Sequence, residues 1–159
     1  MKTINIGEKE YTLEFTFEAA EHKNLVQSMF NLMTGAYFVK QGNNVDDENS
    51  GAVAMVNSVS DMISDMPKIV KIAFYAGLLE HHKISEEQSY ELLKQYMKEN
   101  KLSFKKVFDD IKQYMEEDGF FDLSGLNEMI EEMNQTVEEI QKKTPKKPQD
   151  HKKKQTSTK

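Results

Sequence analysis

The amino-acid sequence predicts an α+β protein, mainly α, with an N-terminal β-hairpin, a helical domain of about five to six helices and a disordered C-terminal tail. Three observations predict this class. Apolar residues alternate at a period of two over residues 4–17, recur at helical spacing from about residue 18 to residue 140, and are missing from residues 142–159. We expect residues 1–141 to form one domain, because a chain of this length can bury a core without disulfides.

The first 17 residues have the pattern of a half-buried hairpin around the turn sequence Gly7-Glu8-Lys9. Its alternating apolar residues are Ile4, Ile6, Tyr11, Leu13, Phe15 and Phe17. Two strands alone are marginally stable in water, so helices or a neighbouring subunit must cover the apolar face. Since the sequence supplies no third strand, we expect Tyr11, Leu13 and Phe15 to lie where another copy of this chain, or a bound partner protein, extends the sheet.

Helical spacing begins at about residue 18. One long helix is expected through about residue 40, followed by a flexible polar loop at about residues 41–51 within the same domain. The next helix is expected to stop before Pro67. Pro67 would then open a helix that is apolar around most of its circumference and is therefore central.

Two further helices carry capping signals. Ser85-Glu86-Glu87-Gln88 has the form of a capping box and predicts a helix that turns Leu92, Leu93, Tyr96 and Met97 inward. Ser103 is the expected N-cap of another helix, and Gly119 is the residue expected to end it.

The last predicted helix has a narrow apolar stripe, with glutamates on most of its other faces. The stripe residues are spaced four, three, four and three apart and are Leu126, Ile130, Met133, Val137 and Ile140. This spacing is typical of a coiled coil, here over about two heptads. Two interpretations stay open, since the stripe can pack on its own domain or dock a helix of another chain.

Charge divides the chain into an acidic body and a basic tail. Residues 1–141 hold 13 lysines and 26 acidic residues, whereas residues 142–159 hold eight lysines and one aspartate. The tail is expected to be disordered, because it has two prolines and no apolar side chain whose burial would offset the ordering entropy. Its paired and tripled lysines are Lys146, Lys147, Lys152, Lys153 and Lys154.

A small nucleic-acid-associated regulator that uses this tail is one alternative function. The chain has no arginine, however, and the tail has no aromatic residue on which a base could stack. Lysines alone give weak, salt-sensitive contacts with phosphates, and the acidic body repels a polyanion. We therefore expect no specific nucleic-acid recognition.

The sequence contains few residue patterns typical of a metal-binding, cofactor-binding or catalytic site. Adjacent His81 and His82 point about 100° apart on a helix and lack the spacing of a zinc motif, so we expect no metal and no cofactor. No phosphate-binding loop or nucleophile motif occurs, and we expect no enzyme. The absence of cysteine, of a signal-like N-terminus and of a long apolar run predicts a cytoplasmic protein without a membrane span. Ten methionines favour adaptable protein binding.

Two stretches resemble a known family. The hairpin sequence INIGEKEYTLEFTF, and the later stretch IVKIAFYAGLLEHHKISEEQSYELL, resemble the tail assembly chaperones of long-tailed phages that infect Gram-positive bacteria. The resemblance covers roughly residues 3 to 140. It implies a chaperone that binds the phage tape measure protein and promotes assembly of the tail tube around it. It also implies a homo-oligomer in the host cytoplasm that is absent from the mature virion.

The resemblance also gives the basic tail a role. Such chaperones often have a longer form, made by a programmed ribosomal frameshift, whose extension recruits the tail tube protein. Consecutive lysine codons are rich in adenine and can form a slippery sequence, so we expect the longer form to diverge within the tail. A structural component of a phage tail or capsid remains the other alternative, since it shares the pattern of a hairpin followed by helices.

Overall fold

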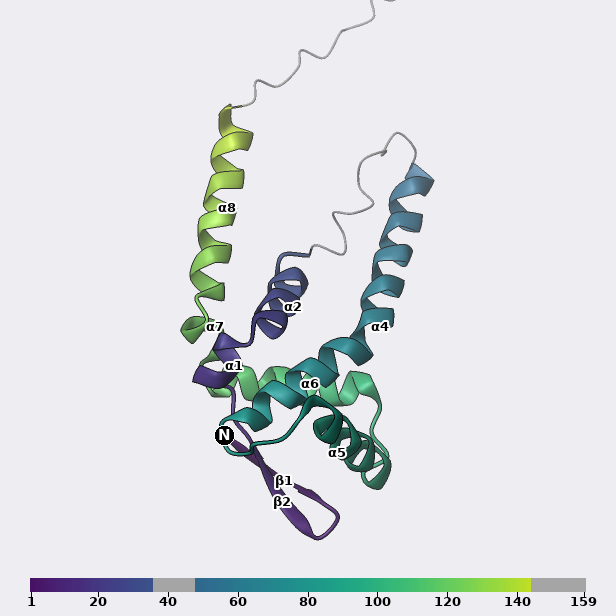
Figure 1. The fold of residues 1–159 in the computed structure, drawn as a ribbon. Coiled ribbons are helices and arrows are strands. Elements are labelled where there is room, and N and C mark those ends of the chain that lie inside the picture. Colours follow the sequence, from purple (N-terminus) through teal and green to yellow (C-terminus); the bar gives the residue numbers. More distant parts are fainter. Residues whose placement is uncertain (36–47, 144–159) are drawn as a thin grey trace, which may run out of the picture.

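The computed structural model describes residues 1–35 and 48–143, with side chains for residues 1–35 and 56–136. The described residues form an antiparallel hairpin and seven helices, which confirms a mainly helical fold behind an N-terminal hairpin (Figure 1). The elements are β1 (Lys2–Ile6), β2 (Lys9–Leu13), α1 (Phe17–Glu21), α2 (Lys23–Met33), α4 (Glu48–Leu79), α5 (Glu86–Glu99), α6 (Phe104–Glu117), α7 (Phe120–Leu123) and α8 (Leu126–Lys143).

The second half of α4 forms the centre of the core, as its apolar circumference predicts. Val70, Ala73 and Phe74 are fully buried there. Helices α2, α5 and α6 and strand β2 all pack on α4. The inward residues expected on α5 are confirmed, because Leu93 is buried and Leu92, Tyr96 and Met97 pack partly buried against the core; on α6, Ile111 is buried in the same core. The expected caps at Ser85 and Ser103 are confirmed as well.

Pro67 does not separate two helices. Helix α4 runs unbroken for 32 residues with Pro67 inside it, so the expected stop before this residue is wrong. Proline removes one backbone hydrogen bond and clashes with the preceding turn, and a helix accommodates this by bending. Figure 1 shows α4 changing direction along its length. Met66, Ile69 and Val70 are buried beside the proline, and their packing supports the helix through it.

The expected loop at residues 41–51 also needs correction. Helix α4 already begins at Glu48, so the last four residues of that range are helical. Residues 36–47 lie outside the described part of the chain, as do residues 144–159 of the expected tail.

The single long helix expected after residue 18 is two helices. His22 has an extended backbone between α1 and α2, and its Nδ1 accepts a hydrogen bond from the Leu25 N–H at 3.4 Å. The His22 ring also stands edge-on to Tyr75 of α4, with centroids 5.8 Å apart. This side chain therefore acts as an N-cap, a role that sequence rules assign to serine, threonine, aspartate or asparagine. Helix α2 ends before Gly35, whose φ of 64° is left-handed.

The hairpin turns at Gly7-Glu8, and its strands pair Ile6 with Lys9 and Ile4 with Tyr11. Gly7 has a φ of 61°, as a two-residue hairpin loop requires at this position. Ile4, Ile6 and Leu13 are buried, so one face of the hairpin is core as expected.

The alternating pattern after Leu13 does not continue as a strand. Beyond Leu13 the backbone bonds to helices instead, because the Glu14 N–H donates to the Gly77 carbonyl at 2.8 Å and the Phe15 N–H donates to Asp118 Oδ2 at 2.9 Å. Phe15 is fully buried, whereas Phe17 begins α1 and is 67% exposed. A strand through Phe17 is therefore wrong.

Side chains at the ends of three helices hold the hairpin in place. Glu99 of α5 accepts the Gly7 N–H at 2.9 Å, and Asp118 at the end of α6 accepts the Phe15 N–H. After α4, His82 Nε2 accepts the Thr12 N–H at 2.9 Å, and His81 pairs with Glu14. The two histidines thus attach strand β2 and the residues after it to the central helix.

The contact between His82 and Thr12 predicts a loss of stability in mild acid. Burial, followed by the charge of His81, lowers the pKa of His82, and the Tyr11 ring packs beside it at 5.3 Å. The folded state favours the neutral ring of His82. Its contribution to the free energy of unfolding is therefore fully present above the ordinary histidine pKa of about 6.5, and it is lost as the pH falls below that value. Denaturant unfolding from pH 7.5 to 5 should show a free energy of unfolding that decreases with falling pH in the parent protein. His82→Gln, which keeps an acceptor but cannot titrate, should flatten this pH dependence, and an equal slope in both proteins would contradict this role.

Candidate helix-docking face

Three helical segments extend from the same side of the body. They are α8, α2 and the N-terminal half of α4, and Figure 1 shows α2 between the other two. Each carries exposed apolar side chains. On α4, Val56 and Ile63 are 67% and 56% exposed. We use the term docking face for six apolar residues of α2 and α8 that keep exposed surface, which are Val26, Phe30, Met33, Met129, Ile130 and Met133.

The base of α8 is fixed to the body. Gly125, with a φ of 72°, turns the chain from α7 into α8, and Leu126 is buried. Asn127 Nδ2 donates to Asp122 Oδ1 of α7 at 2.6 Å, and Phe120 of α7 is fully buried in the core. From Asn127 to Thr136, Ile130 alone is half-buried among the described side chains, and the others are exposed. Most of α8 therefore leaves the domain after its first turn.

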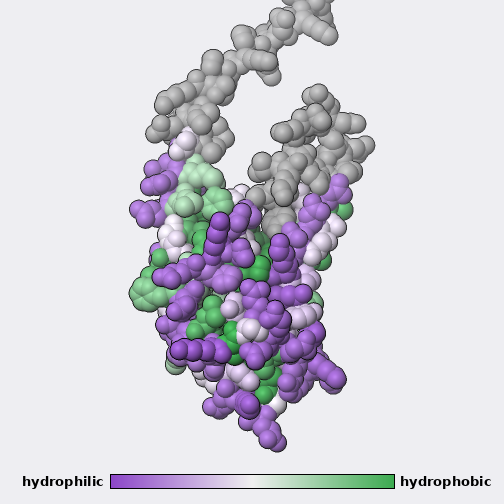
Figure 2. Space-filling view, in the orientation of Figure 1, coloured by the Kyte–Doolittle hydropathy of each residue, from purple (hydrophilic) through white to green (hydrophobic). Residues whose placement is uncertain are grey.

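A groove of about 390 Å³ lies between α2 and the base of α8. Val26 and Phe30 line it from α2, Leu126 and Met129 line it from α8, and Lys23 is also among its lining residues. Figure 2 shows apolar surface at the base of α8 among hydrophilic surroundings. Since Val26 and Phe30 also pack partly against the core, the floor of the groove is held in place by the fold.

The predicted stripe on α8 is divided between two environments. Leu126 is buried against its own domain, Ile130 is half-buried, and Met133 is exposed. Leu126 therefore packs on its own domain, whereas Met133 lies on an open surface. Val137 and Ile140 belong to α8, but their side chains lie outside the described part.

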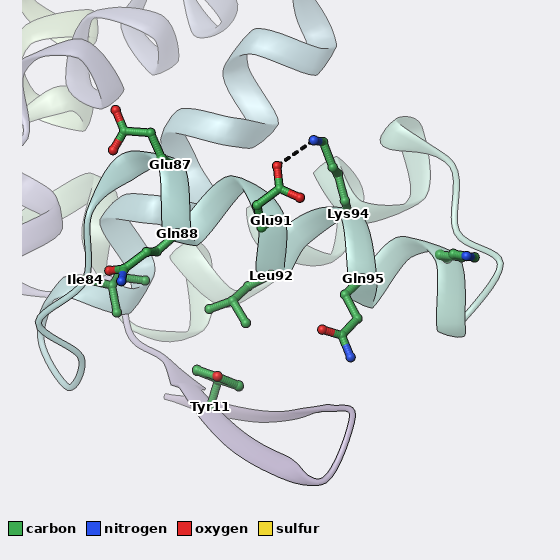
Figure 3. A pocket seen from close by; sticks show the side chains of 9 residues that line it. Tyr11, Ile84, Glu87, Gln88, Glu91, Leu92, Lys94 and Gln95 are labelled. Carbon is green, nitrogen blue, oxygen red and sulfur yellow. Dashed lines mark hydrogen bonds and ion pairs between the residues drawn. The ribbon is translucent and has the colours of Figure 1, made fainter.

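The hairpin residues expected to contact a partner are not together on the surface. Leu13 and Phe15 are buried in the core of this chain and offer no surface, which corrects that expectation. The helices cover this face of the hairpin, and the outward Thr12 N–H on the edge of β2 bonds to His82. Tyr11 is half-buried and lines a separate groove beside α5 (Figure 3). The five tail lysines lie outside the described residues.

Several residues of the docking face do not belong to the predicted α8 stripe. Met129 is 53% exposed and lies three residues after Leu126 and four before Met133, so helical spacing places it on the same face. Phe30 follows the helical pattern of residues 18–40, but spacing alone does not show that it lines a groove together with α8. The tertiary position of α2 decides this.

Acidic side chains flank the docking face on α8. Glu128, Glu131 and Glu132 are exposed there. The described residues contain no cluster of three side chains suited to a metal ion, and none of their helices has the length and apolar character to span a bilayer. The chemistry available at this face is burial of an apolar helix against thioether and aromatic groups, with carboxylates at its border.

Comparisons with family models, with curated proteins and with solved structures found no match to this chain.

Proposed function

We propose that this protein is a phage tail assembly chaperone that binds the tape measure protein and promotes assembly of the tail tube around it. The observation that supports the proposal best is the docking face, where Met33, Met129 and Met133 are 39%, 53% and 36% exposed and Met129 lines an apolar groove. The family resemblance of the sequence implies the tape measure protein as the client. The protein would act in the host cytoplasm and leave before the virion is complete.

Such a client has apolar helical seams of its own that need cover during assembly. A long helical protein that will later be enclosed by a tube exposes these seams during assembly, and exposed apolar patches promote aggregation. Flexible methionines can adapt to successive turns of such a helix. The acidic body, with twice as many acidic residues as lysines in residues 1–141, would make the coated complexes repel one another. In the same proposal, a longer frameshifted form carries the segment that recruits the tail tube protein.

This function predicts the fate of the protein during infection. Mass spectrometry of infected cells should find the chain in complexes with tape measure protein, and purified virions should lack it. A structural tail or capsid component would instead remain in the virion at a fixed stoichiometry, and that result would reject the chaperone proposal. A nucleic-acid-associated regulator would bind DNA or RNA in a salt-dependent manner and would leave the tape measure protein uncaptured.

A further inference from the structure

A second groove lies away from the docking face, between the hairpin and α5. Its volume is about 750 Å³, and it shares no lining residue with the groove between α2 and α8. Leu92 of α5 points toward the side of the groove where Tyr11 of the hairpin lies, and Ile84 lies at one end (Figure 3). The charged residues on the α5 side are Glu87, Glu91, Lys94 and Lys98.

These charges are ordered along the helix. The two glutamates lie in the first half of α5, and the two lysines lie in the second half. Glu87 and Lys98 are equally far from the midpoint between Leu92 and Leu93, and so are Glu91 and Lys94. A second α5 lying antiparallel, centred at this midpoint, therefore places each glutamate opposite a lysine. A parallel copy in register would place like charges opposite each other.

The charges of this face are available to a partner. Lys94 bonds to Glu91 at 2.6 Å, yet their side chains are 50% and 70% exposed, and an exposed pair of this kind contributes little on its own. Within the described residues, Glu87 and Lys98 form no ion pair. On α6, by contrast, Lys105, Lys106 and Lys112 each pair with a carboxylate four residues later on the same helix.

We propose that two copies of this chain associate through α5, antiparallel about a two-fold axis near Leu92. Each α5 would lie in the groove between the hairpin and α5 of the other copy. The interface is self-complementary, as a two-fold contact requires, and it is neutral in charge on an otherwise acidic body. It is independent of the client proposal, and it leaves the docking faces of both copies free, so a dimer could hold one long client at two points.

Charge reversal tests this dimer. Sedimentation of the full chain should show a mass that rises with concentration toward twice the 18.4 kDa of the monomer. K94E/K98E makes the face wholly acidic and E87K/E91K makes it wholly basic, so each variant alone should associate at least about tenfold more weakly. An equimolar mixture of the two variants should form a heterodimer at least as tight as the parent dimer. The quadruple variant, which reverses the order of charges, should regain self-association.

The matched control is K105E/K112E, which makes the same change of net charge as K94E/K98E but on α6, and it should keep the parent mass profile. Thermal midpoints of K94E/K98E and the control should lie close to the parent value, because every replaced side chain is exposed. E87K/E91K should lie slightly lower, because the Glu87 carboxylate accepts hydrogen bonds at the N-terminus of α5. A monomeric parent protein at about 1 mM, unchanged association in the double variants, or a mixture that stays monomeric would each overturn the proposal.

Discussion

Replacing Phe15 with alanine is expected to lower the free energy of unfolding by about 3–5 kcal/mol, as for a large aromatic residue removed from a core. The ring is fully buried and stands edge-on to Phe120, with centroids 6.4 Å apart. It also lies directly against the backbone of α4, because a Cβ atom added at Gly77 would be 2.7 Å from Phe15 Cζ. The residues around the cavity are helical and fixed, so they would collapse into it only in part.

Phe17→Ala is the matched control. This phenylalanine lies two residues further along and is 67% exposed, so its loss should change stability by no more than about 0.5 kcal/mol. Denaturant unfolding followed by circular dichroism gives both values. Similar losses in the two variants would mean that the residues after β2 are not held against α4 and α6 as described.

This pair of phenylalanines shows how far the sequence predicts the fold. Local signals predicted the hairpin turn at Gly7, the capping box at Ser85, the cap at Ser103 and the stop at Gly119, because each depends on a few adjacent residues. The alternating pattern could not distinguish the buried Phe15 from the exposed Phe17. The strand ends because the backbone N–H groups after Leu13 bond to residues of α4 and to the end of α6, and the pattern contains no sign of these long-range bonds. Tertiary packing likewise decides the passage of α4 through Pro67 and the cap at His22.

The candidate site was predictable in part. Helical spacing identified the stripe on α8, and the structure adds that it leaves the body after Leu126. Spacing could not show that α2 lies beside the base of α8, because residues about 100 positions apart form that groove. The same limit applies to the hairpin, whose Leu13 and Phe15 are covered by helices that follow far along the chain.

The double substitution M129D/M133D is expected to abolish capture of the tape measure protein, while the fold remains intact. Met129 and Met133 are 53% and 36% exposed, so the loss of their remaining apolar contacts and the weaker helix propensity of aspartate should together lower the free energy of unfolding by no more than about 3 kcal/mol. At a helix-docking surface, two added carboxylates would have to be buried without partners, which costs several kcal/mol and corresponds to a loss of at least about a hundredfold in affinity.

N134D/Q135D is the matched control. It adds the same two charges to exposed positions of α8 outside the apolar stripe, and it should capture the tape measure protein as the parent does. This comparison separates loss of the apolar surface from added negative charge. Thermal unfolding of the three proteins shows whether each remains folded.

The most direct measurement is the yield of soluble tape measure protein co-purified with each tagged chain after co-expression. We expect capture by the parent protein and by N134D/Q135D, and none by folded M129D/M133D. Equal capture by M129D/M133D and the parent, or no capture by the parent, would contradict the assignment of this face to the tape measure protein.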